Sequence, residues 1–107
     1  MRQVSRFYNH NDQPLRVFVE PLAERIDLAP NQECHALVFG EGPAFLEVAV
    51  HKDGVSMFAA PDCDVAVFVG GQLAAGSLDF IDPTWSRVAN AEYLAWLKDL
   101  GPEQIRT

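Results

Sequence analysis

The side chains best suited to chemistry in this sequence are one carboxylate and two imidazoles, at Glu33, His35 and His51. One residue separates Glu33 from His35, so both side chains lie on the same face if the segment forms a β-strand. Carboxylate oxygens and imidazole nitrogens are ligands of divalent transition metals. The three residues are therefore candidate ligands of a metal ion, and Ser56 and Glu47 are candidate groups for binding a small ligand.

The same residues also allow a second interpretation. Strand ends at the rim of a sheet carry solvated polar side chains, and a glutamate beside a histidine across two strands is an ordinary charge pair. The rest of the sequence offers no complete catalytic set. Neither Cys34 nor Cys63 belongs to a Cys-x-x-Cys pair, and Gly70-Gly71 has no lysine nearby to hold a phosphate. Together, these features favour a protein that is not an enzyme and that needs no cofactor apart from a possible divalent transition metal.

Length and charge restrict the class of protein. A chain of 107 residues, 49% of them hydrophobic, is the size of a single domain with one core, here taken as residues 1–107. The net charge is −7, and Lys52 is the only lysine or arginine between Glu33 and Ile81, which argues against nucleic acid and an anionic membrane surface as partners. No apolar leader or membrane-length segment is evident, so we expect a cytoplasmic protein with both cysteines reduced.

Short runs rich in valine, phenylalanine and leucine alternate with glycine, proline, asparagine and aspartate, as in an antiparallel β-domain. The pattern predicts a mainly β fold, either an antiparallel β-sandwich or a small jelly-roll barrel. The expected strands are Val4–Asn9, Leu15–Glu20, Ile26–Leu28, Gln32–Phe39, Phe45–Lys52, Val55–Ala60, Val65–Val69 and Gln72–Gly76.

Two turns fix how the strands should pair. Asp53-Gly54 favours a two-residue turn with positive φ at both positions, which places Val50 opposite Met57. Gly70-Gly71 suggests a second turn of this kind. If residues 40–44 form a five-residue hairpin loop, the strand ending at Phe39 pairs with the strand beginning at Phe45.

That pairing brings the chemical groups together. It puts Glu33 opposite His51 and His35 diagonal to His51, and the Asp-Gly turn puts Ser56 opposite His51. The convergence of the candidate metal site therefore depends on this hairpin. A shift of one residue would send these groups to opposite faces.

The predicted sheet has apolar residues on both faces and therefore needs two covers. One cover can be a second sheet. The other can be a C-terminal helix at about residues 83–100, which begins with an aspartate cap and a proline and carries Trp85, Val88 and Ala89 on one face. This helix packs on its own sheet or forms a seam with a partner. The candidate interface residues are Phe39, Phe45, Phe58, Tyr93, Trp96 and Leu100.

A resemblance to cupin and jelly-roll proteins lies in the segment Leu28-Ala29-Pro30-Asn31-Gln32-Glu33-Cys34-His35. In those proteins a turn with proline or glycine leads into a strand that carries metal-binding histidines. The resemblance implies a metal-binding strand at this position, although Glu33 stands where a cupin motif has its first histidine. The segments Tyr8–Leu15, Glu20-Pro21 and Leu28–Pro30 are similar to small bacterial proteins of unassigned role. That similarity implies a fold and no activity.

The sequence favours a small bacterial binding or assembly module that is not an enzyme and that associates with itself or with a protein partner. The alternative is a cupin-like protein that binds a metal or a small ligand through Glu33, His35 and His51, with or without enzymatic activity.

Overall fold

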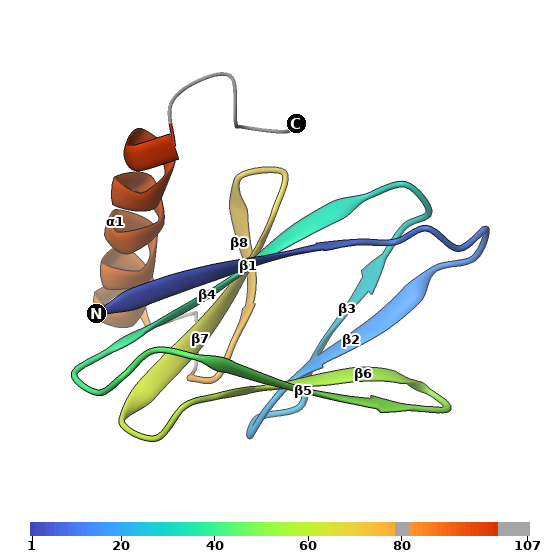
Figure 1. The fold of residues 1–107 in the computed structure, drawn as a ribbon, viewed down its shortest axis with the longest axis horizontal. Helices are drawn as coiled ribbons and strands as arrows, with labels where there is room; N and C mark the ends of the chain where they lie inside the picture. The colour runs from blue at the N-terminus through green and yellow to red at the C-terminus, as the bar shows by residue number, and fades with distance from the viewer. Residues whose placement is uncertain (79–81, 101–107) are drawn as a thin grey trace.

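The computed structural model describes residues 1–78 and 82–100, and this part of the chain forms eight β-strands and one C-terminal helix (Figure 1). All eight predicted strands are present, with ends within two residues of those expected, and the helix has the predicted bounds. A mainly β fold with one C-terminal helix is therefore confirmed. The elements are β1 (Arg2–Tyr8), β2 (Leu15–Val19), β3 (Glu24–Leu28), β4 (Glu33–Gly40), β5 (Leu46–His51), β6 (Gly54–Ala59), β7 (Cys63–Val69), β8 (Gln72–Gly76) and α1 (Pro83–Leu100).

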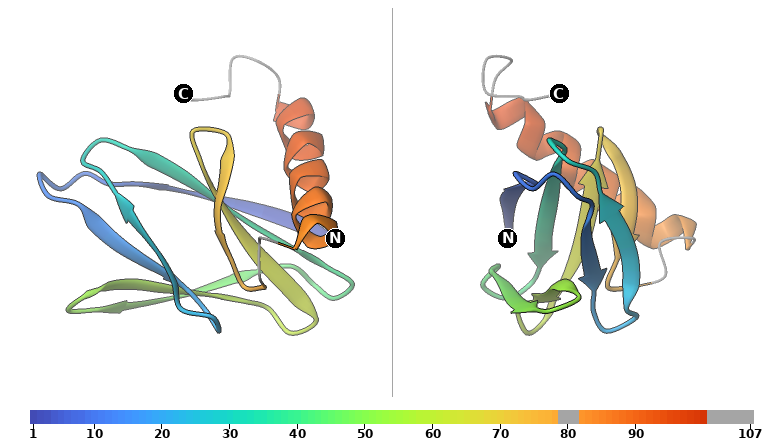
Figure 2. Two further views of the ribbon diagram at one scale, coloured as in Figure 1. Left: turned by 180° about the vertical axis from the view of Figure 1, so that it is seen from behind. Right: turned by 90° about the vertical axis from the view of Figure 1, so that its right-hand side faces the viewer.

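Within the described residues the strands form two four-stranded sheets, which Figure 2 shows from two further sides. The helix-side sheet has the strand order β1-β4-β7-β8, and the outer sheet has the order β3-β2-β6-β5. Neighbouring strands are antiparallel except β2 and β6, which run parallel. The outer sheet is therefore mixed, which corrects the purely antiparallel arrangement expected from the sequence.

The two sheets share one apolar core. Strand β4 contributes every second residue to it, at Cys34, Ala36 and Val38, because side chains alternate along a strand. The outer sheet contributes Val17 and Met57, among others. All of these side chains are buried, so the core lies between the two sheets.

The alternate residues of β4 form a second apolar cluster with α1. Leu37 and Phe39 pack there against Trp85, Ala89 and Tyr93 of the helix. The helix therefore covers the second face of the helix-side sheet within the same chain, which confirms the first of the two arrangements expected for it. The proposed interface roles of Phe39 and Tyr93 need correction, since both are buried against their own chain, at 7% and 4% exposure.

The start of α1 has the predicted cap. The backbone N–H of Thr84 donates to the Asp82 carboxylate at 2.9 Å, and Pro83 occupies the first helical position. Within the described residues, no helix is long and apolar enough to cross a membrane.

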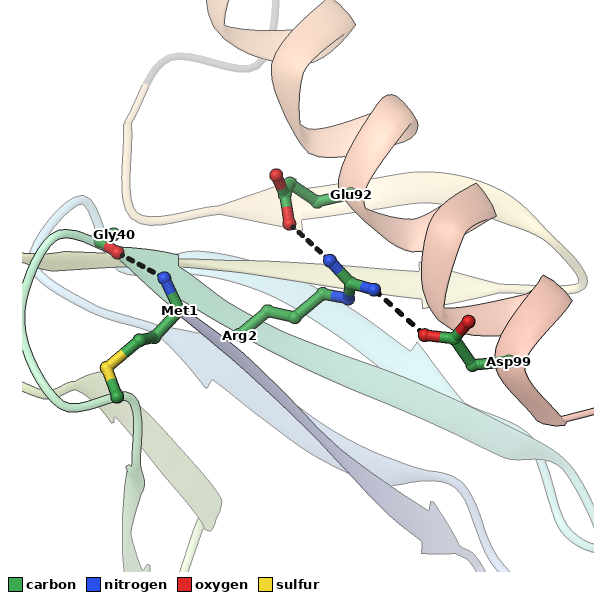
Figure 3. Close-up of polar contacts among 5 residues, drawn as sticks. All are labelled: Met1, Arg2, Gly40, Glu92 and Asp99. Carbon is green, nitrogen blue, oxygen red and sulfur yellow. Dashed lines mark hydrogen bonds and ion pairs between the residues drawn. The ribbon is translucent and has the colours of Figure 1, made fainter.

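The first strand is also tied to the helix (Figure 3). The Arg2 guanidinium pairs with Glu92 at 3.3 Å and with Asp99 at 3.0 Å, and the terminal ammonium of Met1 donates to the Gly40 carbonyl at 2.9 Å. Exposed ion pairs of this kind each contribute at most about 1 kcal/mol. These contacts add to the buried aromatic cluster that packs α1 on the helix-side sheet.

The predicted hairpin between β4 and β5 is wrong, because these strands belong to different sheets. Strand β4 pairs instead with β1 and β7. The physical reason is burial: residues 34–39 of β4 are buried on both faces, whereas residues 47–51 of β5 are exposed. A strand buried on both faces belongs at the centre of a covered sheet, and a strand with Glu47 and His51 on its surface suits an edge.

The turn between β5 and β6 lies one position earlier than predicted. His51 pairs with Gly54, so Lys52 and Asp53 form the two-residue loop and Val50 lies opposite Val55 rather than Met57. Gly54 alone of this group has a positive φ, 143°. The shift in pairing is two residues, so each side chain keeps its predicted face. The turn at Gly70-Gly71 is confirmed, with φ values of 60° and 81°.

Gly54 is required by its neighbour as well as by its φ. A Cβ atom at this position would collide with the backbone oxygen of Arg16 on the parallel strand β2. We expect Gly54→Ala to lower the free energy of unfolding by about 1–3 kcal/mol, measured by urea denaturation. Gly70→Asn is the control: nothing lies within 4 Å of a Cβ there, and asparagine tolerates a φ near 60°. Equal losses in both variants would contradict this explanation.

Candidate functional site

A buried chain of hydrogen bonds joins the helix-side sheet to the helix. The His35 ring lies 2.7 Å (Nε2) from the Glu33 carboxylate and 2.6 Å (Nδ1) from the Tyr93 hydroxyl. A carboxylate only accepts, so His35 donates from Nε2 to Glu33. When the ring is neutral, its Nδ1 atom accepts from the Tyr93 hydroxyl. The side chains of His35 and Glu33 are only 8% and 13% exposed, so the three groups form a nearly dry polar network.

The fold positions each member of this network. The two-residue period of β4 puts Glu33 and His35 on the face that α1 covers. Tyr93 lies on the buried side of α1, where its ring stacks on Phe68 of β7 with a centroid distance of 4.0 Å. The Trp96 ring contacts the His35 ring edge-on at 5.2 Å. Ring contacts with Tyr93 and Trp96 therefore help to hold the orientation of the imidazole.

The network forms part of the wall of a pocket with a volume of about 530 Å³. The pocket lies between α1, the loop before β4 and the turn between β7 and β8. Its lining combines an aromatic and aliphatic side with polar groups from the loop and from β4. The lining residues are Ala29, Pro30, Asn31, Gln32, Glu33, His35, Phe68, Gly70, Gly71, Tyr93 and Leu97. A smaller pocket of about 330 Å³ lies beside Cys63 and Asp64, where the Trp85 indole N–H donates to the Asp64 carboxylate at 3.1 Å.

Burial and one nearby charge shape the electrostatics of this region. Burial, followed by the negative charge of Glu33, raises the pKa of Tyr93, and the Arg6 guanidinium partly opposes this rise. Arg6 also lies over the Trp96 ring at 5.5 Å. Tyr93 therefore stays protonated over the physiological range and acts as a hydrogen-bond donor. The network can therefore orient a ligand, but the Tyr93 hydroxyl is not an activated nucleophile.

The cysteine next to this network is buried on the opposite face of β4. Burial, and then the charge of Glu33, raises the pKa of the Cys34 thiol to about 12. Cys63 is partly exposed, and both cysteines are free. We expect a thiol reagent at neutral pH to label one cysteine, Cys63, in the folded protein and both after unfolding. Labelling of Cys34 in the folded Cys63→Ser variant would contradict this.

The raised pKa also has a consequence for stability. The unfolded chain releases the Cys34 proton near its ordinary pKa of about 8.5, while the folded chain holds it until about pH 12. This contribution to stability is complete below about pH 8.5 and is lost as the pH rises toward 12. The Cys34→Ala variant should therefore lose stability less steeply over this range.

The structure separates His51 from the other two candidate metal ligands. His51 lies on β5 in the outer sheet, where its Nε2 atom is 3.0 Å from the Ser56 hydroxyl and its ring is 5.7 Å from that of Phe18. Among residues 1–78 and 82–100, no group of three or more histidine, cysteine, aspartate or glutamate side chains could hold a metal ion. The structure thus brings Glu33 together with His35, and Ser56 together with His51, but it does not assemble the predicted set of three.

The remaining candidates lie mostly on the outer sheet. Glu47 is exposed and lies opposite Phe58. Phe45 and Phe58 are 49% and 38% exposed, so they remain accessible to a partner. Trp96 is partly buried in the cluster under α1. The side chain of Leu100 lies outside the described part of the chain.

The chain matches no protein-family model, no curated protein and no solved structure. The resemblance to cupin proteins therefore stays a prediction, and the site has to be interpreted from its own geometry.

Sequence reasoning missed the role of Tyr93 and Phe68 in this site. The apolar helix face that carries Tyr93 predicts packing on the chain's own sheet or an interface with a partner, and neither prediction includes a hydrogen bond to His35. The signal that could have placed it is the presence of His35 on a strand face that also carries Leu37 and Phe39. A polar ring on such a face requires a hydrogen-bonding partner from the element that covers it.

Proposed function

We propose that this chain is a binding module without enzymatic activity, and that the pocket between α1 and β4 is its binding site. The proposal is supported by the composition of the pocket wall, in which a fixed polar network lies beside a stacked pair of aromatic rings. Pockets for small molecules combine an apolar surface with a few fixed polar groups. No metal is part of the proposal, because His51 lies on the other sheet.

The chemistry of the lining favours one class of small molecule. Glu33 is the residue in the lining that carries a formal charge when His35 is neutral, and the whole chain has a net charge of −7. Phe68, Leu97 and the Tyr93 ring supply the apolar surface. The pocket therefore suits a small organic molecule with an apolar body and an amine head group that donates hydrogen bonds.

Titration with benzylamine and benzoate, followed by amide chemical shifts, tests this proposal. The two probes have similar size and opposite charge. We expect benzylamine to shift the amide signals of Gln32, Gly70 and Gly71, and benzoate to shift them less. If neither probe shifts these signals, or if benzoate binds as well as benzylamine, the proposed site is wrong.

A blocked pocket provides the matched control. Ala29 is exposed at the edge of the pocket, and Ala91 is exposed on the helix away from it. Ala29→Trp should abolish the shifts caused by benzylamine, while Ala91→Trp should leave them unchanged.

Self-association is the second candidate function, and it is supported by the exposed apolar side chains of the outer sheet. Phe45, Val50 and Phe58 are 49%, 81% and 38% exposed, respectively. Light scattering during gel filtration tests it: a dimer whose fraction falls on dilution is expected, and a monomer at every concentration would contradict it. The cytoplasmic location and the bacterial type expected from the sequence stay predictions.

We also propose a more specific fold class for the two sheets. We assign the chain to the β-sandwiches rather than to the barrels. Support comes from two separate strand orders and a common core between the sheets.

A further inference from the structure

Strand β5 is an uncovered edge of the outer sheet. In the described part of the chain it has one strand neighbour, β6, and it runs along the lower margin of the view in Figure 1. All residues of 47–51 are exposed, and Val50 has 81% of its surface accessible. The strand contains no proline and no lysine, the two residues that most often protect an edge from pairing with another chain.

The pairing with β6 shows which backbone groups of β5 point outward. The N–H of Ala60 donates to the carbonyl of Phe45, at the position where the antiparallel ladder of β5 and β6 begins. Hydrogen-bonded pairs alternate along such a ladder, so the backbone groups of odd-numbered β5 residues face β6. Those of Leu46, Val48 and Val50 therefore face away from the sheet and can pair with a further strand.

The other three sheet edges are less suited to pairing. Strand β3, at the far edge of the outer sheet, contacts β8, which is an edge of the helix-side sheet. Strand β1 carries Arg2 and Arg6 together with Gln3 and Ser5. Two arginines on one strand are like charges, which disfavour pairing of β1 with a second copy of itself. Strand β5 is thus the edge that combines exposed aliphatic residues with outward-facing backbone groups.

We propose that β5 pairs antiparallel with β5 of a second copy of this chain, with the two-fold axis at Ala49. The inference rests on the self-association proposed above and identifies the β5 edge as the surface through which the two copies associate. Val48 then lies opposite Val50 of the partner subunit in a hydrogen-bonded pair, and the two outer sheets join into one continuous sheet. The aliphatic side chains that are exposed in the monomer pack against each other across the axis.

Pairing of a carboxylate with an imidazole selects this register. Glu47 lies opposite His51 of the partner subunit, in a pair without backbone hydrogen bonds, where side chains approach most closely. The two-fold axis makes two such pairs. Moving the register by two residues in one direction puts Glu47 opposite Ala49, and moving it in the other direction puts Glu47 opposite Asp53, a like charge. Each Glu47 carboxylate thereby gains an imidazole partner at the contact, in a chain whose net charge of −7 otherwise opposes association.

Disulfide trapping tests the position of the axis. In a pair without backbone hydrogen bonds the Cα atoms are about 4.5 Å apart, within the range for a disulfide. The test uses the full chain with Cys63→Ser, because Cys63 is partly exposed and Cys34 is buried. We expect Ala49→Cys to give a covalent dimer on mild oxidation. Glu47→Cys and His51→Cys should not cross-link alone, and a mixture of the two should.

A charge exchange tests the register independently. Glu47→Lys should raise the dissociation constant of the dimer at least about tenfold, since it loses two favourable cross-strand pairs. Adding His51→Glu to this variant places opposite charges at each pair and should return the constant to within about threefold of the parent value. Circular dichroism checks that each variant keeps its fold.

The outcomes separate this inference from the proposal on which it rests. A dimer that neither cross-links through Ala49→Cys nor responds to Glu47→Lys forms through another surface, and this overturns the pairing of β5 while self-association stands. A monomer at all concentrations overturns both. Trapping at Ala49 together with rescue by the charge exchange establishes the interface.

Discussion

Replacing Phe68 by alanine is expected to lower the free energy of unfolding by about 3–5 kcal/mol. Phe68 is 1% exposed and stacks on Tyr93 with the two rings tilted by only 7°. The substitution removes this stack and leaves a cavity under the helix, which the surrounding strands cannot fill. Urea denaturation followed by far-UV circular dichroism measures the loss.

Phe58→Ala is the matched control for Phe68→Ala. Phe58 is also a phenylalanine on a β-strand, but it is 38% exposed on the outer sheet. We expect it to cost much less than Phe68→Ala, because water already reaches much of the ring. If both variants lost the same free energy, the cluster under α1 would not be the main support of the helix.

Replacing His35 by alanine is expected to cost about 3 kcal/mol or more. The substitution removes the ring that bonds both to the Glu33 carboxylate and to the Tyr93 hydroxyl. It leaves a largely buried charge and a buried hydroxyl without their shared partner. Removing one member of a buried polar network costs more than the net value of its hydrogen bonds, because the remaining groups stay desolvated.

Two variants separate this network effect from the loss of a ring. Tyr93→Phe keeps the stack on Phe68 and removes one hydrogen bond, so it should cost about 1–2 kcal/mol. His51→Ala removes an exposed histidine of the outer sheet and should leave the stability close to that of the parent. Denaturation curves for the three variants, with near-UV circular dichroism to follow Tyr93 and Trp96, give the comparison. Equal stability of His35→Ala and His51→Ala would rule out a role for the network.

The local elements could be predicted from the sequence because their signals are local. Alternating apolar residues gave the strands, Gly70-Gly71 gave a turn, and Asp82-Pro83 gave the start of the helix. The two faces of β4 could also be predicted, since a period of two residues sends Cys34 and His35 to opposite sides wherever the strand pairs.

The pairing of β4 could not be predicted in the same way. The sequence suggested a hairpin between strands that are neighbours in the chain, whereas β4 pairs with β1 and β7. Which strands pair depends on how much apolar surface the whole chain can bury, and this is a property of all strands together. The position of the turn before Gly54 was also decided from outside the hairpin, by the approach of β2.

The candidate site likewise has one part that the local sequence predicts and another that depends on the packing of the whole chain. The sequence alone determined that Glu33 and His35 share a strand face, because backbone geometry fixes the direction of alternate side chains. Only the tertiary structure decided that Tyr93 completes their network and that His51 lies on the other sheet. Contacts between distant segments depend on the packing of the whole chain, and residue spacing within one segment carries no information about it.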